Sequence, residues 1–223
     1  KYPRDFAGDA ALLAQVGCAM VFTGSLEAFF PGELVEGELP AASHVAPGPS
    51  AAGLEGDFRP GHFDGVATIV DRLFDVVEPN RAYFGAKDFQ QCLVVQHVAA
   101  RRGGQPEIVR CPTVREAAGV AMSSRNALLD GASRSRAEVL SRALFATKAA
   151  WAAGERDAAA LSRLLREGVS MPGIEVEYAE VRDPEVWTAN APEGAMERAV
   201  GLVAVNVGGV RLIDNMEFDE GTR

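Results

Sequence analysis

The sequence is poor in the residues and motifs that mark hydrolytic or metal-dependent chemistry. It has three histidines among 223 residues, and His44, His62 and His97 lie too far apart to form a paired zinc site. It contains no G-x-S-x-G, no Walker A motif, no G-x-G-x-x-G and no H-x-G-H nucleotide motif. The sequence therefore gives no support to a serine hydrolase, a P-loop protein or a dinucleotide-binding protein.

Cysteine and long apolar runs are also scarce. Cys18, Cys92 and Cys111 are an odd number, have no C-x-x-C spacing and each adjoin an apolar run, so we expect three small core residues in a reducing compartment. No apolar run approaches the roughly 18 residues that span a bilayer, and no signal peptide is visible. These features predict a cytoplasmic protein without a membrane partner.

Positive charge is not in excess, since the net charge is −9. Broad electrostatic capture of nucleic acid or of an acidic membrane is therefore not expected. Any anionic ligand must be held by a local basic pocket. The hydrophobic fraction of 48% and the charged fraction of 24% are typical of a globular protein with one large or two modest domains.

The first half of the chain alternates helices with short apolar strands, which is the order typical of a parallel α/β sheet. The helices are expected from apolar spacing, and Gly17 and Pro79 end two of them. In chain order we expect a helix over 5–16, a buried strand over 19–22, a loop-rich stretch over 31–61, a helix over 63–77, a buried strand at 82–84, a helix over 89–101 and a buried strand over 107–110.

The second half has a different, α+β pattern. Asp130 and Asp157 can each cap a helix, and Gly208-Gly209 is a strong hairpin signal between two apolar runs. The expected elements are helices over 130–153 and 157–168, and strands over 174–178, 198–207 and 210–216. We place the domain boundary near Thr113, which gives domains of residues 1–113 and 114–223.

The stretch from Arg81 to Gln91 is the first candidate site. Gly85 lets the chain turn after a strand, and Lys87 and Asp88 then stand at the start of a helix, where α/β sheets bind ligands. The ammonium of Lys87 could neutralise phosphate, and Asp88 could order Mg²⁺, a ribose or an amine. Gln91 can face the same pocket as Asp88 because it lies three residues further on. The alternative is an ordinary loop with a surface ion pair.

The second candidate site is Met122-Ser123-Ser124-Arg125. Two hydroxyls, the local backbone amides and a fixed guanidinium suit a polyphosphate that gains negative charge at its leaving group. The alternative is a helix cap or turn, which Ser-Ser sequences form often.

Taken together, seven ordered blocks resemble the pantoate–β-alanine ligase (AMP-forming) family over nearly the whole chain. One block would be weak evidence, whereas seven in the right order are hard to obtain by chance. The blocks are residues 2–5, 54–56, 59–63, Phe84-Gly85 with 87–91, 112–116, 122–126 and 211–215.

The resemblance implies an incomplete Rossmann-like nucleotidylyltransferase-type domain of the α/β class, a smaller α+β C-terminal domain that closes over it, and a homodimer. It also implies a two-step reaction. Pantoate attacks the α-phosphate of Mg²⁺-bound ATP to give pantoyl adenylate and pyrophosphate, and β-alanine then displaces AMP to give pantothenate.

The resemblance also assigns residue roles at matching positions. Catalysis would rest on Lys87, Ser123, Ser124 and Arg125, with no resident metal. ATP would contact Gly85, Ala86, Lys87, Asp88, Val114, Met122, Ser123, Ser124 and Arg125. Pantoate would contact Gln91, Arg59, Ile69 and Val70.

The sequence departs from the family pattern at three places. Ala86 and Ala118 stand where the family usually has Glu and Asp, and each change removes a carboxylate near the site. The family's P-T-M-G-x-L-H-x-G-H and V-N-P-x-Q-F segments are absent from these 223 residues. Loss of such preorganised donors typically costs about 10² to 10³ in rate each, so we expect this polypeptide alone to be inactive and poorly stable.

Two other functions compete with the ligase. A non-catalytic binding or assembly module is favoured by the two altered carboxylates, whereas retention of Lys87, Asp88, Gln91 and Ser123-Ser124-Arg125 favours the enzyme. A nucleotidylyltransferase with another acid substrate is disfavoured by Gln91 and the Arg59 block.

Overall fold

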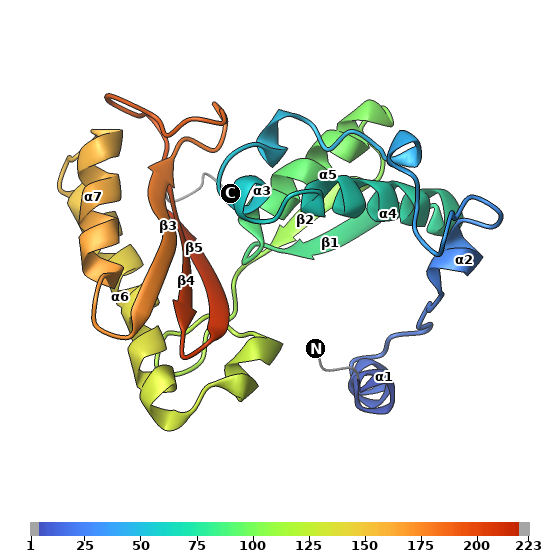
Figure 1. Cartoon of the computed structure of the whole chain (residues 1–223), viewed down its shortest axis with the longest axis horizontal. Coiled ribbons are helices and arrows are strands. Elements are labelled where there is room, and N and C mark those ends of the chain that lie inside the picture. The colour runs from blue at the N-terminus through green and yellow to red at the C-terminus, as the bar shows by residue number, and fades with distance from the viewer. Residues whose placement is uncertain (1–4, 219–223) are drawn as a thin grey trace. The chain divides into compact units, whose positions relative to one another are not determined.

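The computed structural model describes residues 5–218 and divides the chain into two compact units, residues 1–44 and 45–223 (Figure 1). None of the helices within this described range is long and apolar enough to cross a membrane.

The first unit contains short helices joined by irregular chain. Helix α1 (Phe6–Gln15) is capped by Asp5, which accepts a hydrogen bond from the Gly8 N–H, and confirms the helix expected there. Helix α2 (Leu26–Phe29) is capped in the same way by Ser25. A 3₁₀ turn, η1 (Ala41–Ser43), follows.

The strand expected over residues 19–22 is wrong, and so is the core position expected for Cys18. Residues 19–22 form no strand, and Met20, Phe22 and Cys18 are exposed. A strand needs a neighbouring strand to satisfy its backbone groups, and among the described residues no strand pairs with this run. Apolar composition alone therefore misassigned it.

The second unit begins with a loop-rich stretch, as the sequence predicts. It contains a 3₁₀ turn, η2 (Pro49–Ala51), and a four-residue helix, α3 (Glu55–Phe58). Leu54 precedes α3 with a φ of +46°, a positive value that non-glycine residues rarely adopt, and its side chain is buried.

A parallel pair of strands and two helices follow. Helix α4 (His62–Val77) leads to β1 (Arg81–Gly85), and α5 (Phe89–Arg101) leads to β2 (Glu107–Cys111). The strands pair in parallel from Arg81↔Glu107 to Gly85↔Cys111, which confirms the predicted parallel connection. The α4–α5 core includes Phe63, Phe74, Val94, Val95 and Val98.

The strands of this pair are less buried than the sequence predicts. Ala82 and Phe84 pack against the α4–α5 core, but Tyr83 points to the other face and is 63% exposed. Successive side chains of a strand face opposite sides, so β1 is a half-buried strand. Residues of β2 are likewise at most half-buried, and Cys111 at its end is half-buried, whereas Cys92 in α5 is buried as expected.

The rest of the second unit is an antiparallel sheet with two helices on one face (Figure 1). A 3₁₀ turn, η3 (Ser124–Leu128), precedes α6 (Gly131–Ala152) and α7 (Ala158–Val169). The sheet order is β3 (Ile174–Arg182), β4 (Val200–Val207), β5 (Val210–Glu217). Asp130 and Asp157 cap α6 and α7, and the Gly208-Gly209 hairpin joins β4 to β5, all as predicted.

The two faces of the antiparallel sheet bury different partners. One face packs on α6 and α7 through residues that include Leu144, Leu161 and Val203. Residues that include Tyr178, Leu202 and Ala204 pack with Leu54 and Phe89 from the earlier part of the unit. This second cluster lies beside the candidate site. The boundary near Thr113 stays a prediction.

Candidate active site

The turn after β1 presents Lys87 and Asp88 at the carboxyl end of the parallel pair. The Ala86 N–H donates to the carbonyl of Cys111 over 2.8 Å, and the Asp88 N–H closes the turn on the carbonyl of Gly85 over 3.2 Å. Lys87 is half-buried and Asp88 is exposed. The strand end and the first turn of α5 thus place a cation and an anion side by side.

Two neighbouring cavities meet at Lys87. The first encloses about 350 Å³, counted with the space open to solvent, and its lining includes Arg59, Lys87, Asp88 and Gln91. The second encloses about 320 Å³ on the same measure and is lined by Lys87, Ser123 and Arg125, among others. The structure therefore brings together groups predicted to bind pantoate and groups predicted to bind ATP.

The Ser123–Arg125 segment has features of both structures predicted from its sequence, a helix cap and a phosphate site. The Ser123 hydroxyl accepts a hydrogen bond from the Arg125 N–H over 3.2 Å and caps η3, which is the turn interpretation. Arg125 nevertheless lines the second cavity, and its guanidinium donates to the carbonyl of Arg211 over 3.3 Å. A cap that holds a guanidinium at a cavity edge is compatible with phosphate binding.

The remaining predicted site residues lie outside the linings of these two cavities. Val70 is buried in the α4–α5 core and Ile69 is half-buried beside it, while Val114 and Met122 are 65% and 56% exposed. Ala86 lines a broader groove along β2 instead. Gly85 and Ser124 also fall outside both linings.

A buried ion network that the sequence patterns do not reveal lies beside the first cavity. The Arg211 guanidinium contacts both carboxylate oxygens of Glu55, at 2.5 and 3.1 Å, and also binds Glu177. The Tyr178 hydroxyl donates to Glu55 Oε1 over 2.8 Å, and Arg59 lies 3.4 Å from Oε2. Glu55 therefore joins Arg59, a predicted pantoate contact, to strands β3 and β5.

This network has clear effects on ionisation. Burial opposes the charge on Glu55, but the hydrogen bonds and charge of Arg211, helped by Tyr178, outweigh it, so the pKa of Glu55 lies below its usual value. Burial and the Glu55 charge raise the pKa of Tyr178 well above its usual range, which keeps its hydroxyl a hydrogen-bond donor. Burial and the charge of Arg59 lower the pKa of His62, another cavity residue, which favours its neutral form.

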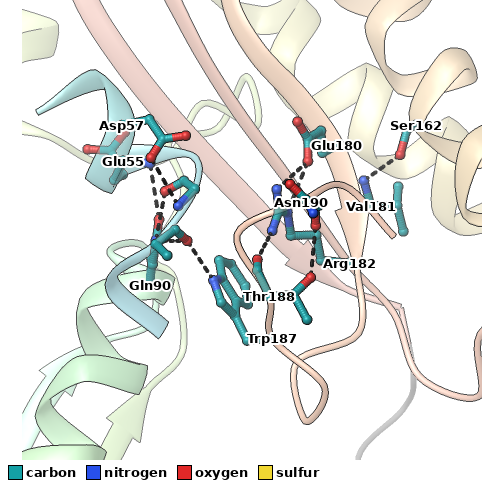
Figure 2. Close-up of polar contacts among 12 residues, drawn as sticks. Glu55, Asp57, Gln90, Ser162, Glu180, Val181, Arg182, Trp187, Thr188 and Asn190 are labelled. Atoms are coloured by element: carbon teal, nitrogen blue, oxygen red, sulfur yellow. Dashed lines mark hydrogen bonds and ion pairs between the residues drawn. The ribbon is translucent and has the colours of Figure 1, made fainter. Parts of the chain in front are cut away.

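Gln90 fixes the loop that carries Glu55. Its side-chain carbonyl accepts from the Glu55 N–H over 3.1 Å (Figure 2). Its NH₂ group donates to the carbonyls of Ser50, Gly53 and Ala52 at 2.8, 3.0 and 3.3 Å. The indole N–H of Trp187 also donates to the Ala52 carbonyl (Figure 2). Gln90 and the neighbouring Gln91 both line the first cavity.

Asp214 lines both cavities and forms a bidentate pair with Arg115. The two contacts measure 2.7 and 3.0 Å, and the Asp214 side chain is almost fully buried. Burial outweighs the Arg115 contact, so the pKa of Asp214 lies above its usual value. The sequence blocks at 54–56 and 211–215 contain these polar groups, but they do not show which of them pair.

Comparison with known proteins bears on what this site does. The family model described as pantoate-beta-alanine ligase matches residues 1–217. The chain is 45% identical to pantothenate synthetase 1 of Bradyrhizobium diazoefficiens, over 97% of this chain and 73% of that protein.

Two solved structures extend the comparison to the fold. A pantothenate synthetase from Thermus thermophilus matches with a TM-score of 0.85 at 40% identity, over 98% of this chain and 76% of that one. A pantoate-beta-alanine ligase from Francisella tularensis, complexed with beta-gamma ATP and beta-alanine, matches with a TM-score of 0.68 at 25% identity, over 99% and 72%. These matches confirm the predicted Rossmann-like nucleotidylyltransferase-type fold.

Proposed function

Because this chain belongs to the pantoate–β-alanine ligase family, we propose that its two cavities serve the ATP-dependent condensation of pantoate with β-alanine. In the first step the pantoate carboxylate attacks the α-phosphorus of ATP, and pyrophosphate leaves as pantoyl adenylate forms. In the second step the amine of β-alanine attacks the acyl carbon, and AMP leaves as the amide bond of pantothenate forms.

The observation that carries this proposal is the position of Lys87 between the two cavities. On one side, Arg59 and Gln91 supply a cation and an amide for a hydroxy acid. On the other side, Ser123 and Arg125 supply a hydroxyl and a guanidinium for phosphate. A cation shared by both cavities stands where a carboxylate would meet the α-phosphate and where negative charge grows in the transition state.

The divalent cation in this proposal arrives with the nucleotide. Among residues 5–218 no group of three or more His, Cys, Asp or Glu side chains could hold a metal ion. Mg²⁺ commonly keeps several waters and binds through one or two carboxylates plus substrate phosphates. The exposed carboxylate of Asp88 fits that role.

The remaining roles are carried over from the resemblance. Outside the linings of the two cavities, the residues that would contact ATP are Gly85, Ala86, Val114, Met122 and Ser124. The residues outside the linings that would contact pantoate are Ile69 and Val70. A homodimer remains a prediction of the family resemblance, and a cytoplasmic location remains a prediction of the cysteine usage and the lack of long apolar runs. Light scattering of the purified protein tests the dimer.

The alternative is a non-catalytic binding or assembly module. Ala86 and Ala118, which stand where the family usually has acidic residues, favour it. For the 223-residue polypeptide by itself we also propose no turnover, because its sequence holds no H-x-G-H segment. Pantoate-dependent release of pyrophosphate by that polypeptide would refute the proposal that it has no turnover by itself.

The test of the binding function is calorimetric titration with Mg²⁺ and ATP, and then with pantoate. We expect Lys87→Met to weaken ATP binding about 10- to 100-fold, or about 1.4–2.8 kcal/mol. Lys148→Met is the matched control, since Lys148 lies on α6 and donates to the carbonyl of Glu217, outside both linings. Equal ATP affinity in Lys87→Met and the unsubstituted protein would overturn the assignment.

A further inference from the structure

The side chain of Asn215, which lies on β5, contacts the turn that carries Lys87. The Asn215 NH₂ group donates to the carbonyl of Ala86 over 2.9 Å and to the carbonyl of Lys87 over 2.7 Å. Both distances are those of well-formed hydrogen bonds. Asn215 thus contacts two successive peptide groups of the turn.

These two carbonyls belong to the peptide planes that flank the Lys87 Cα atom. A peptide group is planar, so the backbone at one residue is described by two dihedral angles. One hydrogen bond to the plane before Lys87 and one to the plane after it therefore restrain both angles. They also restrain the direction in which the Lys87 side chain leaves the backbone, although neither bond involves its ammonium group.

Asn215 is itself firmly placed. Asn215 is 6% exposed. Its backbone N–H donates to Asp214 Oδ1 over 2.8 Å, and its backbone carbonyl accepts from the Arg115 guanidinium over 3.1 Å. It also pairs with Leu202 of β4 in the sheet register. The hold on the turn therefore comes from a rigid sheet, not from a mobile loop.

We propose that Asn215 is a positioning residue that keeps the Gly85–Asp88 turn in the conformation that directs Lys87 toward ATP. The inference rests on the proposed function for the role of Lys87, but the hold on the turn stands on the contacts alone. Without Asn215, the turn keeps the bonds from the Ala86 N–H to the Cys111 carbonyl, from the Asp88 N–H to the Gly85 carbonyl and from Cys92 Sγ to the Gly85 carbonyl. None of these bonds involves the carbonyls of Ala86 and Lys87, which Asn215 contacts.

The first variant to test is Asn215→Asp. It keeps the size of the side chain but replaces the donor NH₂ with an oxygen that faces two carbonyl oxygens. Asn215→Ala removes the donor without adding charge, so it separates loss of the hydrogen bonds from repulsion. Asn80→Asp is the matched control, because it makes the same chemical change at an exposed position just before β1, at the opposite end of that strand.

Two measurements on the 223-residue chain decide the proposal. Hydrogen–deuterium exchange should become at least about tenfold faster in peptides covering residues 85–91 of both Asn215 variants, while α7 peptides exchange as in the unsubstituted protein. Calorimetry with Mg²⁺ and ATP should show at least about tenfold weaker binding in both variants. Asn80→Asp should change neither quantity.

Unchanged exchange at 85–91 in both variants would overturn the inference, whether or not ATP binds. Faster exchange at the turn with unchanged ATP affinity would also overturn it, because the turn's conformation would then not matter for the nucleotide. If exchange is faster in the Asn215 variants but the unsubstituted protein does not bind ATP, the contact of Asn215 with the turn is supported and the proposed function is overturned. Faster exchange with weaker ATP binding supports both.

Discussion

The hydroxyl of Tyr178 donates a hydrogen bond to Glu55 Oε1 over 2.8 Å, across 123 residues of sequence. Tyr178 lies on β3 of the antiparallel sheet, and Glu55 opens the short helix α3. Arg59, a predicted pantoate contact, lies one turn beyond Glu55 and pairs with the same carboxylate. The sheet in the later part of the chain therefore supports a loop that builds the first cavity.

Removal of the Tyr178 hydroxyl should destabilise the fold. The side chain is 4% exposed, and its partner is a carboxylate, so Tyr178→Phe should lower the free energy of unfolding by about 1.5–3 kcal/mol. Urea unfolding measures this change. Tyr83→Phe removes the same group from a side chain that is 63% exposed, and we expect a change within about 0.5 kcal/mol. Equal effects of the two substitutions would contradict the prediction.

Stability should depend on pH through Glu55. Its folded-state pKa lies below the ordinary 4.5, so the folded protein favours the ionised form. That contribution is complete above about pH 4.5 and is lost as the pH falls through the folded-state pKa. We expect Glu55→Gln to be less stable than the unsubstituted protein at pH 7, with a gap that narrows below pH 4.5.

Urea unfolding at several pH values between 7 and 3 measures this gap. Asp214 has the opposite sign, because its pKa is raised above 3.8 and its contribution falls as the pH rises. Asp214 is present in both proteins, so its effect cancels in the comparison. A gap that widens toward acid pH would show that the Glu55 carboxylate is not stabilised by Arg211.

Loss of Arg115 should be more costly than loss of a surface arginine. Arg115→Ala leaves the Asp214 carboxylate, whose side chain is 2% exposed, without its bidentate partner. Breaking a buried pair in this way typically costs about 3–5 kcal/mol. Thermal and urea unfolding provide the measurement.

Arg81→Ala is the matched control for Arg115→Ala. The Arg81–Glu107 pair has both side chains 60% exposed, and exposed pairs contribute little to stability. A second check is Asp214→Asn in the Arg115→Ala background, which should recover part of the lost stability because it removes the buried charge. Failure of both expectations would mean that the pair is effectively solvated.

The adjacent glutamines should give different phenotypes. Gln90→Ala removes hydrogen bonds to the loop over residues 50–55 and should lower the free energy of unfolding by about 2–4 kcal/mol, at about 1 kcal/mol for each bond. Gln91→Ala should change stability little, because Gln91 is half-buried at the cavity, and should instead weaken pantoate binding. Unfolding and calorimetric titration of both variants test this. Loss of stability in Gln91→Ala and loss of pantoate binding in Gln90→Ala would contradict the prediction.

Much of the local structure could be predicted because its causes are local. Asp130 and Asp157 each cap the helix that follows, and two glycines with positive φ form the β4–β5 hairpin. In each case the residues that determine the structure are close in sequence. Apolar spacing also placed α4 and α5, because one face of each helix meets the same core.

The errors and omissions have a different physical origin. Residues 19–22 have the composition of a strand but no partner strand within the described chain. The Glu55–Arg211 pair joins residues 156 apart, and the Asn215 contacts with the turn join residues 128 and 129 apart. Pairings at such separations depend on how distant elements pack, which neither spacing nor propensity encodes. The motif blocks marked these residues without revealing their partners.

The contacts of Asn215 also set an order of events during synthesis. Lys87 is made 128 residues before the side chain that fixes its turn. At about 5–20 residues per second, a ribosome needs roughly 6–26 s to cover that distance. Throughout this interval the nascent chain lacks Asn215, which contacts the Lys87 turn. For nearly all of it the chain also lacks Arg211, which pairs with Glu55. The proposed nucleotide site is therefore completed late in translation, although Lys87 is made early.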